Sequence, residues 1–246
     1  MVGALAGPRR PSLDAGRCLV QATVFLVLFA AARGLGLLGP PVVSATLLTL
    51  GMALIAWRAG ATLEDLGLGR DRVGAGLRYG LAAALLVLVA LLLAAVIPWT
   101  RPFLSDTRAE IGGGQLAYEV GVTVVLLTAV PEELAFRGVL LGSARRLWGG
   151  WRAALTSSAL FGLWHIEPTV ETMSGNSAVG GASASLVGQV LVVLGSIAVT
   201  FVAGLAFSWL RLRSRSLVAP VLAHVASNSL ALTVAWFAVS TSRLTT

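Results

Sequence analysis

The chain has 246 residues, of which 57% are hydrophobic and 12% are charged, and its formal net charge is +7. A soluble domain is about 25% charged, so this composition excludes an ordinary soluble protein and predicts an all-α, polytopic bundle of transmembrane helices. The positive charge comes from arginine alone, without a basic run that would suggest a nucleic-acid partner, and the single cysteine, Cys18, excludes an intrachain disulfide and a thiolate metal cluster.

Three apolar stretches in the N-terminal half predict the first three spans, at residues 18–38, 42–57 and 74–99. The first stretch continues beyond the small residues at 30–32, so we interpret it as an uncleaved anchor in preference to a signal peptide. The polar segment 58–72 is expected to be a loop with room for a short interfacial helix. The segment 100–115 is expected to be a charged loop with a glycine hinge at 112–114.

The C-terminal half predicts four further spans, at residues 116–147, 151–166, 186–212 and 217–239. Pro131 is expected to kink the first of these helices and to make room for a polar cavity. The segment 167–185 is rich in serine and glycine, which predicts a mobile loop. We therefore expect one integral membrane domain over residues 1–246 with about seven spans, or eight as an alternative. Residues 1–115 would hold the first three spans, and residues 116–239 the helices that carry the functional motifs.

Arginine placement predicts a cytoplasmic N-terminus, because loops on the cytoplasmic side are enriched in basic residues. With seven spans, thirteen arginines fall on the inner side, namely Arg9, Arg10, Arg17, Arg58, Arg70, Arg72, Arg78, Arg145, Arg146, Arg152, Arg211, Arg213 and Arg215. Four fall towards the outer side, namely Arg33, Arg101, Arg108 and Arg243.

Three ionisable residues, Glu132, Glu133 and Arg137, lie inside the fourth predicted span. Each charge costs about 2.5–3.5 kcal/mol at the centre of a spanning helix, so such residues normally face a bundle interior or a wet cavity. Residues four apart share a helix face, so Glu133 and Arg137 can pair, which leaves Glu132 without a partner on its own helix. This stretch alone leaves two interpretations open, a structural ion network and a reactive carboxylate.

The two histidines of the chain, His165 and His224, also lie within predicted spans. Glu132, His165 and Asn228 each stand 13 residues from a flanking inner arginine, which predicts a common depth of about 20 Å, with His224 one helical turn shallower. A carboxylate, two imidazoles and an amide at one depth can deprotonate a water and stabilise an oxyanion. This set favours hydrolysis of an acyl bond over a purely structural role.

Three motifs in this order resemble the CPBP family, which comprises CAAX-processing and Abi-type intramembrane endopeptidases. They are Glu132-Glu133-x-x-x-Arg137, Phe161-x-x-x-His165 and His224-x-x-x-Asn228. The resemblance covers about residues 116–239, while the first three spans resemble the family in hydropathy only.

The resemblance implies a glutamate-dependent protease on an all-helical membrane fold. Glu132 and His165 would activate the attacking water, and His224 and Asn228 would bind the oxyanion. Glu133, Arg137 and Phe161 would support them. A zinc ion held by Glu132, His165 and His224 is an alternative, since two histidines and a glutamate can bind zinc with one open position. We favour a metal-free mechanism without a cofactor, because the motifs lack the His-Glu-x-x-His arrangement of ordinary zinc peptidases.

The expected partners are the lipid bilayer and a peptide or membrane-anchored protein substrate, with no nucleic acid. An arginine- and alanine-rich chain without lysine is typical of a GC-rich bacterial genome, so we expect an integral protein of a bacterial cytoplasmic membrane. The alternative function is a non-proteolytic scaffold or bacteriocin-immunity-type protein with the same fold.

Overall fold

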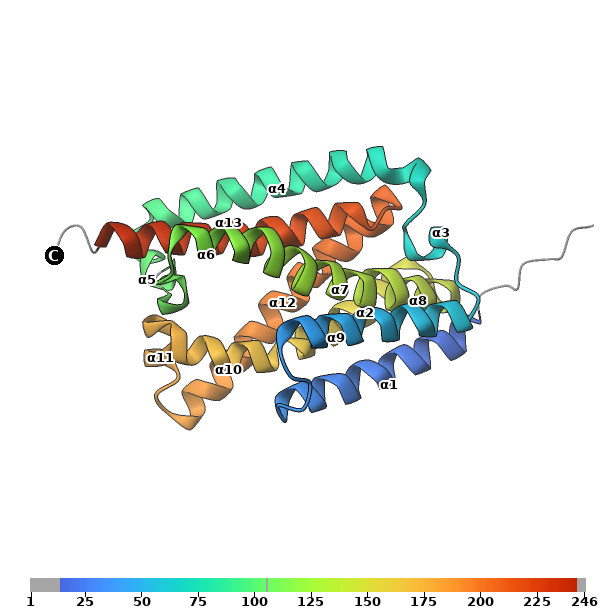
Figure 1. The fold of residues 1–246 in the computed structure, drawn as a ribbon, viewed down its shortest axis with the longest axis horizontal. Helices are drawn as coiled ribbons and strands as arrows, with labels where there is room; N and C mark the ends of the chain where they lie inside the picture. The colour runs from blue at the N-terminus through green and yellow to red at the C-terminus, as the bar shows by residue number, and fades with distance from the viewer. Residues whose placement is uncertain (1–13, 105, 243–246) are drawn as a thin grey trace, which may run out of the picture.

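The computed structural model describes residues 14–104 and 106–242, and this part of the chain is 86% helical without a strand (Figure 1). The all-α prediction is therefore confirmed. The elements are α1 (Ala15–Gly34), α2 (Pro41–Arg58), α3 (Leu63–Leu66), η1 (Arg70–Arg72), α4 (Val73–Val96), α5 (Arg101–Leu104), η2 (Thr107–Ala109), α6 (Gly113–Tyr118), η3 (Glu119–Ala129), α7 (Val130–Glu133), η4 (Leu134–Leu140), α8 (Leu141–Trp148), α9 (Gly150–Trp164), α10 (Ile166–Gly175), α11 (Ser177–Ala182), α12 (Leu186–Ser214) and α13 (Val218–Ser242). Elements η1 and η2 are 3₁₀ helices, whereas η3 and η4 are π-helices.

Five helical segments of the described chain are long and apolar enough to cross a membrane, so the protein is an integral membrane protein. They are Ala15–Gly34, Pro41–Arg58, Leu63–Val96, Leu186–Ser214 and Val218–Ser240. They correspond to the first, second, third, sixth and seventh predicted spans, with ends that differ by several residues, while the exact number of spans and the orientation stay predictions. Arg9, Arg10 and Arg243, on which the orientation partly depends, lie outside the described residues.

The other two predicted spans are helical but irregular or short. The fourth corresponds to a helical run from α6 to α8 that alternates between α and π geometry. The fifth corresponds to α9, whose 15 residues reach about 22 Å at 1.5 Å per residue, less than the roughly 30 Å of a bilayer core. A short helix, α3, is present in segment 58–72 and begins with a capping box between Thr62 and Asp65, while its place at a membrane interface stays a prediction.

Two predicted loops contain more helix than expected. Helices α10 and α11 occupy most of segment 167–185, so the prediction of a loop there was wrong. The Asn176 side chain caps α11 by accepting hydrogen bonds from the backbone N–H groups of Ala178 and Val179. The polar residues that suggested a loop therefore end one helix and start the next. Similarly, Gly112 is the N-cap of α6 and Gly113 begins that helix, so the expected glycine hinge is a helix start.

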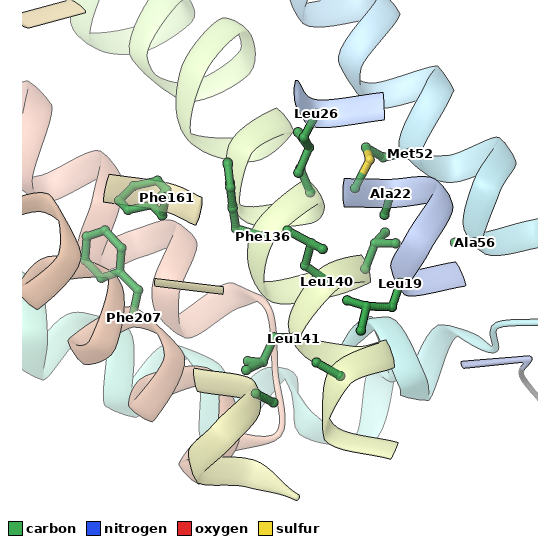
Figure 2. Close-up of a cluster of buried hydrophobic side chains, with 14 of the residues drawn as sticks. Leu19, Ala22, Leu26, Met52, Ala56, Phe136, Leu140, Leu141, Phe161 and Phe207 are labelled. Carbon is green, nitrogen blue, oxygen red and sulfur yellow. The ribbon is translucent and has the colours of Figure 1, made fainter. Parts of the chain in front are cut away.

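The motif-bearing run from α6 to α8 passes through the middle of the bundle (Figure 1). Helices α4 and α13 lie side by side along one edge, α12 packs against α9, and α1 packs against α2, η4 and α8. The apolar core joins these elements. Figure 2 shows Leu19, Ala22 and Leu26 of α1 and Met52 of α2 facing Leu140, with Phe136, Phe161 and Phe207 on the far side of the cluster.

Charged side chains of the motifs are buried and many apolar side chains are exposed, which is the reverse of a soluble protein. Glu133 and Arg137 are 0% exposed, whereas apolar side chains such as Leu86 and Val199 are about 70% exposed. In water such a surface would be an aggregation liability, but in a bilayer it meets lipid tails. The interior can then hold the polar groups of the motifs.

Candidate active site

Glu132 and Glu133 end α7, a four-residue α-helical segment between two π-helical stretches. π-Helical geometry is rare and is found frequently at functional sites. Arg137 follows in η4, and its Nη1 donates to Glu133 Oε1 at 2.9 Å, with both side chains fully buried. The predicted pairing of Glu133 with Arg137 is therefore confirmed.

His224 of α13 completes this buried ion pair. Its Nδ1 lies 2.9 Å from the same Glu133 Oε1, and a carboxylate only accepts, so Nδ1 carries a proton and donates. The imidazole stacks on Phe207 with ring centroids 5.3 Å apart. Packing and hydrogen bonding thus fix the ring orientation, and its Nε2 points towards Glu132 at 4.0 Å from Oε2.

Glu132 has two differently placed carboxylate oxygens. Oε1 accepts a hydrogen bond of 2.9 Å from the indole Nε1 of Trp164, whereas Oε2 is buried and has no hydrogen-bond partner among the described residues. The 4.0 Å between Oε2 and His224 Nε2 is too long for a direct hydrogen bond. As predicted, Glu132 has no partner on its own helix, but the partner that α9 supplies was not foreseen.

His165 directly follows α9, and Phe161 separates it from His224. Its Nδ1 lies 2.7 Å from the carbonyl oxygen of Phe161, which only accepts, so the proton of a neutral ring is on Nδ1 and Nε2 has the lone pair. The Phe161 ring is 4.4 Å from His165, 5.9 Å from His224 and 4.0 Å from the Arg137 guanidinium. Within the described residues, His165 makes no hydrogen bond to Glu132.

Asn228 lies one helical turn beyond His224 on α13 and is half-buried. In the described part of the chain its side chain makes no hydrogen bond. The amide is therefore available to a ligand, but its place relative to Glu132 rests on the helix spacing.

The zinc alternative requires Glu132, His165 and His224 to come together around one ion. Among the described residues, no group of three histidine, cysteine, aspartate or glutamate side chains is arranged to hold a metal ion. His224 Nδ1 is already engaged by Glu133, which leaves one nitrogen of that ring for any ligand. The metal-free site and the alternative of a zinc ion held by Glu132, His165 and His224 both stay predictions.

A second layer of polar contacts around Trp164 was not apparent in the sequence. Arg33 of α1 lies over the indole ring at 4.3 Å, and its Nη2 donates to the Trp164 carbonyl at 3.1 Å. The same guanidinium pairs with Glu167 at the start of α10, with Nε and Oε2 2.9 Å apart. The position of Arg33 near the end of an apolar helix indicated that this residue has a polar partner. The sequence does not show that the partners come from α9 and α10.

Comparison with known proteins gives one family match. A family model described as type II CAAX prenyl endopeptidase Rce1-like matches residues 115–230, a stretch that contains all the motif residues. The match supports a CAAX-type protease and gives no support to the Abi-type or metalloprotease descriptions. Neither the curated proteins nor the solved structures that were searched yield a match.

Proposed function

From the match of residues 115–230 to the Rce1-like family of type II CAAX prenyl endopeptidases, we propose that the chain hydrolyses peptide bonds with an activated water. The observation that carries this proposal is the buried, unpartnered Oε2 of Glu132 beside His224 Nε2. Leaving a buried acceptor unsatisfied costs about 1–3 kcal/mol or more. A water within hydrogen-bond distance of both Oε2 and Nε2 would satisfy the carboxylate, and one water can bridge two atoms that are 4.0 Å apart.

In this mechanism Glu132 is the general base, assisted by His165. The water donates a proton to Oε2 as its oxygen attacks the carbonyl carbon of the scissile peptide. The neutral His165 ring offers its Nε2 lone pair, so it can pass that proton on to the leaving amine. The C–N bond then breaks, the carboxyl product keeps the water oxygen, and Glu132 returns to its ionised form.

His224 and Asn228 would stabilise the oxyanion of the tetrahedral intermediate. Because His224 Nδ1 donates to Glu133, Nε2 can donate to the oxyanion only when the ring carries both protons. Glu133 balances that charge and Arg137 holds Glu133 in place. The two residues thus act through His224 and do not touch the substrate.

The substrate we propose is a membrane-anchored protein or a peptide within a bacterial cytoplasmic membrane. No step requires a metal or another cofactor. The second candidate, a scaffold or immunity-type protein without activity, is not favoured by the family match, and the chain retains every motif residue that chemistry would need.

The test is a cleavage assay with the purified full chain in proteoliposomes that contain a library of membrane-anchored peptides. Mass spectrometry of new termini should find cleavage by the wild-type chain and none by His224→Ala. Wild-type chain that produces no new terminus, or identical termini with His224→Ala, would contradict the proposal.

A further inference from the structure

A polar cavity of about 340 Å³ lies at the end of the bundle where α3, η1, α8 and the last turn of α12 meet. Its charged lining has five arginines, Arg72, Arg145, Arg146, Arg211 and Arg215, and three acidic residues, Glu64, Asp65 and Asp71. None of these residues belongs to the motifs. The formal charge of the lining is therefore +2.

Only two of the five arginines in the lining form a salt bridge with an acidic residue. Asp65 pairs with Arg146, and Asp71 pairs with its neighbour Arg72. The Asp65 carboxylate is further engaged by the backbone N–H and the hydroxyl of Thr62. In the described part of the chain, Arg145, Arg211 and Arg215 have no salt bridge, and Glu64 is the one acidic residue of the lining that also has none, so cationic side chains are in excess.

Arg211 is the unusual member, because its side chain is only 3% exposed. Nη2 donates to the Asp65 carbonyl at 3.0 Å, and Nε is buried without a hydrogen-bond partner. The guanidinium packs so closely over Gly67 that a Cβ there would clash with it. Buried charges are normally paired with an opposite charge. One neutral carbonyl does not supply that charge, so the Arg211 guanidinium has no salt bridge among the described residues.

The backbone at the mouth of the cavity adds to this picture. Arg215 adopts a left-handed conformation with φ of 56° directly after α12, a position that helices usually give to glycine. An arginine in this conformation is strained. Its side chain adds a second cation of the cavity, besides Arg211, at the same end of α12. Strained residues of this kind cluster at binding sites.

We propose that this cavity binds a phosphate group, carried either by a phospholipid headgroup or by free phosphate. Guanidinium groups match phosphate geometry, and a phosphate offers enough oxygens for three arginines, whereas a carboxylate offers two. Two exposed indoles lie at about the depth of the cavity along their helices, since Trp148 is two residues after Arg146 and Trp209 is two residues before Arg211. Tryptophan is enriched at the headgroup level of membranes, which brings the cavity within reach of lipid phosphate.

The test uses the purified full chain in an uncharged detergent with two probes, inorganic phosphate and dioleoylphosphatidylglycerol. Native mass spectrometry counts the bound lipid, and thermal unfolding at constant ionic strength reports the binding of phosphate. The variant is Arg145→Gln combined with Arg215→Gln, because both side chains are exposed and unpaired and their loss should not disturb folding. Arg213→Gln is the matched control, since Arg213 is exposed on the same helix but does not line the cavity.

We expect saturable binding of at least one probe to the wild-type chain, about tenfold weaker binding to the double variant, and no change in the control. Binding of the lipid alone would identify the headgroup as the source, and binding of phosphate alone would identify a soluble source. Saturable binding of neither probe, or equal weakening by Arg213→Gln, would overturn the proposal. Arg211→Gln should abolish the site if it folds, and the double variant decides the case if it does not.

Discussion

Glu132 and Glu133 are adjacent in the sequence but have opposite surroundings. Glu133 is fully buried and shares Oε1 between Arg137 and His224. Glu132 is held at one oxygen by Trp164, and its other oxygen has no partner among the described residues. The first arrangement stabilises structure and orients a histidine, whereas the second leaves a basic oxygen available for chemistry.

Trp164 is expected to position Glu132 without contacting the substrate. Trp164→Phe removes the indole donor and keeps an aromatic ring for the stacking on Phe29. Loss of one charge-assisted hydrogen bond should lower kcat about 10- to 100-fold and change KM by less than about twofold. Steady-state kinetics in proteoliposomes checks this, and a change in KM alone would contradict it.

The Glu133–Arg137 pair is expected to be structural, so its loss should appear as instability. Either Glu133→Gln or Arg137→Met strands a fully buried charge, at about 3–5 kcal/mol, whereas the double variant should lose less than the sum. Thermal unfolding in detergent for both single variants and the double variant measures the coupling. Additive losses would mean that the two side chains do not depend on each other.

Much of this residue-scale picture could be predicted from the sequence. The spacing of four between Glu133 and Arg137 gave the ion pair, because that contact lies within one helix. The bond from Trp164 to Glu132 could not be predicted, since it depends on how α9 rotates against α7. The same applies to His224, whose Nδ1 contact with Glu133 joins α13 to the motif run.

At the scale of elements, the site depends on a close crossing of α9 and α12. A Cβ built on Gly162 would lie 2.9 Å from the carbonyl oxygen of Ile197, so any side chain would separate the two helices. Gly162 stands between Phe161 and His165, and the same displacement would move both. The position of His165 therefore depends on a glycine at residue 162, which lets α9 pack closely on α12.

Gly162→Ala is expected to destabilise the fold by about 1–3 kcal/mol and to reduce turnover. Gly121→Ala is the matched control, because it is also helical but its Cβ would meet nothing within 4 Å. Thermal unfolding and cleavage assays on both variants test this. Equal behaviour of the two would contradict a close crossing at Gly162.

The sequence predicted the long apolar helices well and the irregular ones poorly. Hydropathy located α1, α2, α4, α12 and α13, because length and apolar content suffice for a membrane span. It could not distinguish π from α geometry around Glu132, since both keep the chain helical and apolar. It also missed α10 and α11, where serine and glycine residues cap and begin short helices.

At the scale of the whole molecule, an apolar exterior encloses a buried set of ionisable residues that spans α7, η4 and α13. Lipid on the outside and low polarity within strengthen electrostatic interactions at the site. The same exclusion of water makes it costly to leave a charge unpaired. The bundle thus gives the two glutamates different surroundings, with Glu133 in an ion pair and Glu132 outside one.

Metal dependence is a property of the purified protein as a whole. If Glu132 and His165 activate water without a metal, chelator-treated chain should keep its activity, and metal analysis should find far less than one zinc per chain. Stoichiometric zinc that is lost and restored together with activity would overturn the metal-free reading. The same residues, Glu132, His165 and His224, would then hold the ion.

The most direct test of the central claim is the turnover of Glu132→Gln beside Glu119→Gln, on a peptide that the wild-type chain cleaves in proteoliposomes. Glu119 lies in the same helical run but lines a separate pocket with Arg108 and Gln115. Removal of a general base typically costs 10²- to 10⁴-fold in rate, so Glu132→Gln should fall by about that factor while Glu119→Gln stays near wild type. Glu132→Gln that stays folded and cleaves at the wild-type rate would contradict the claim.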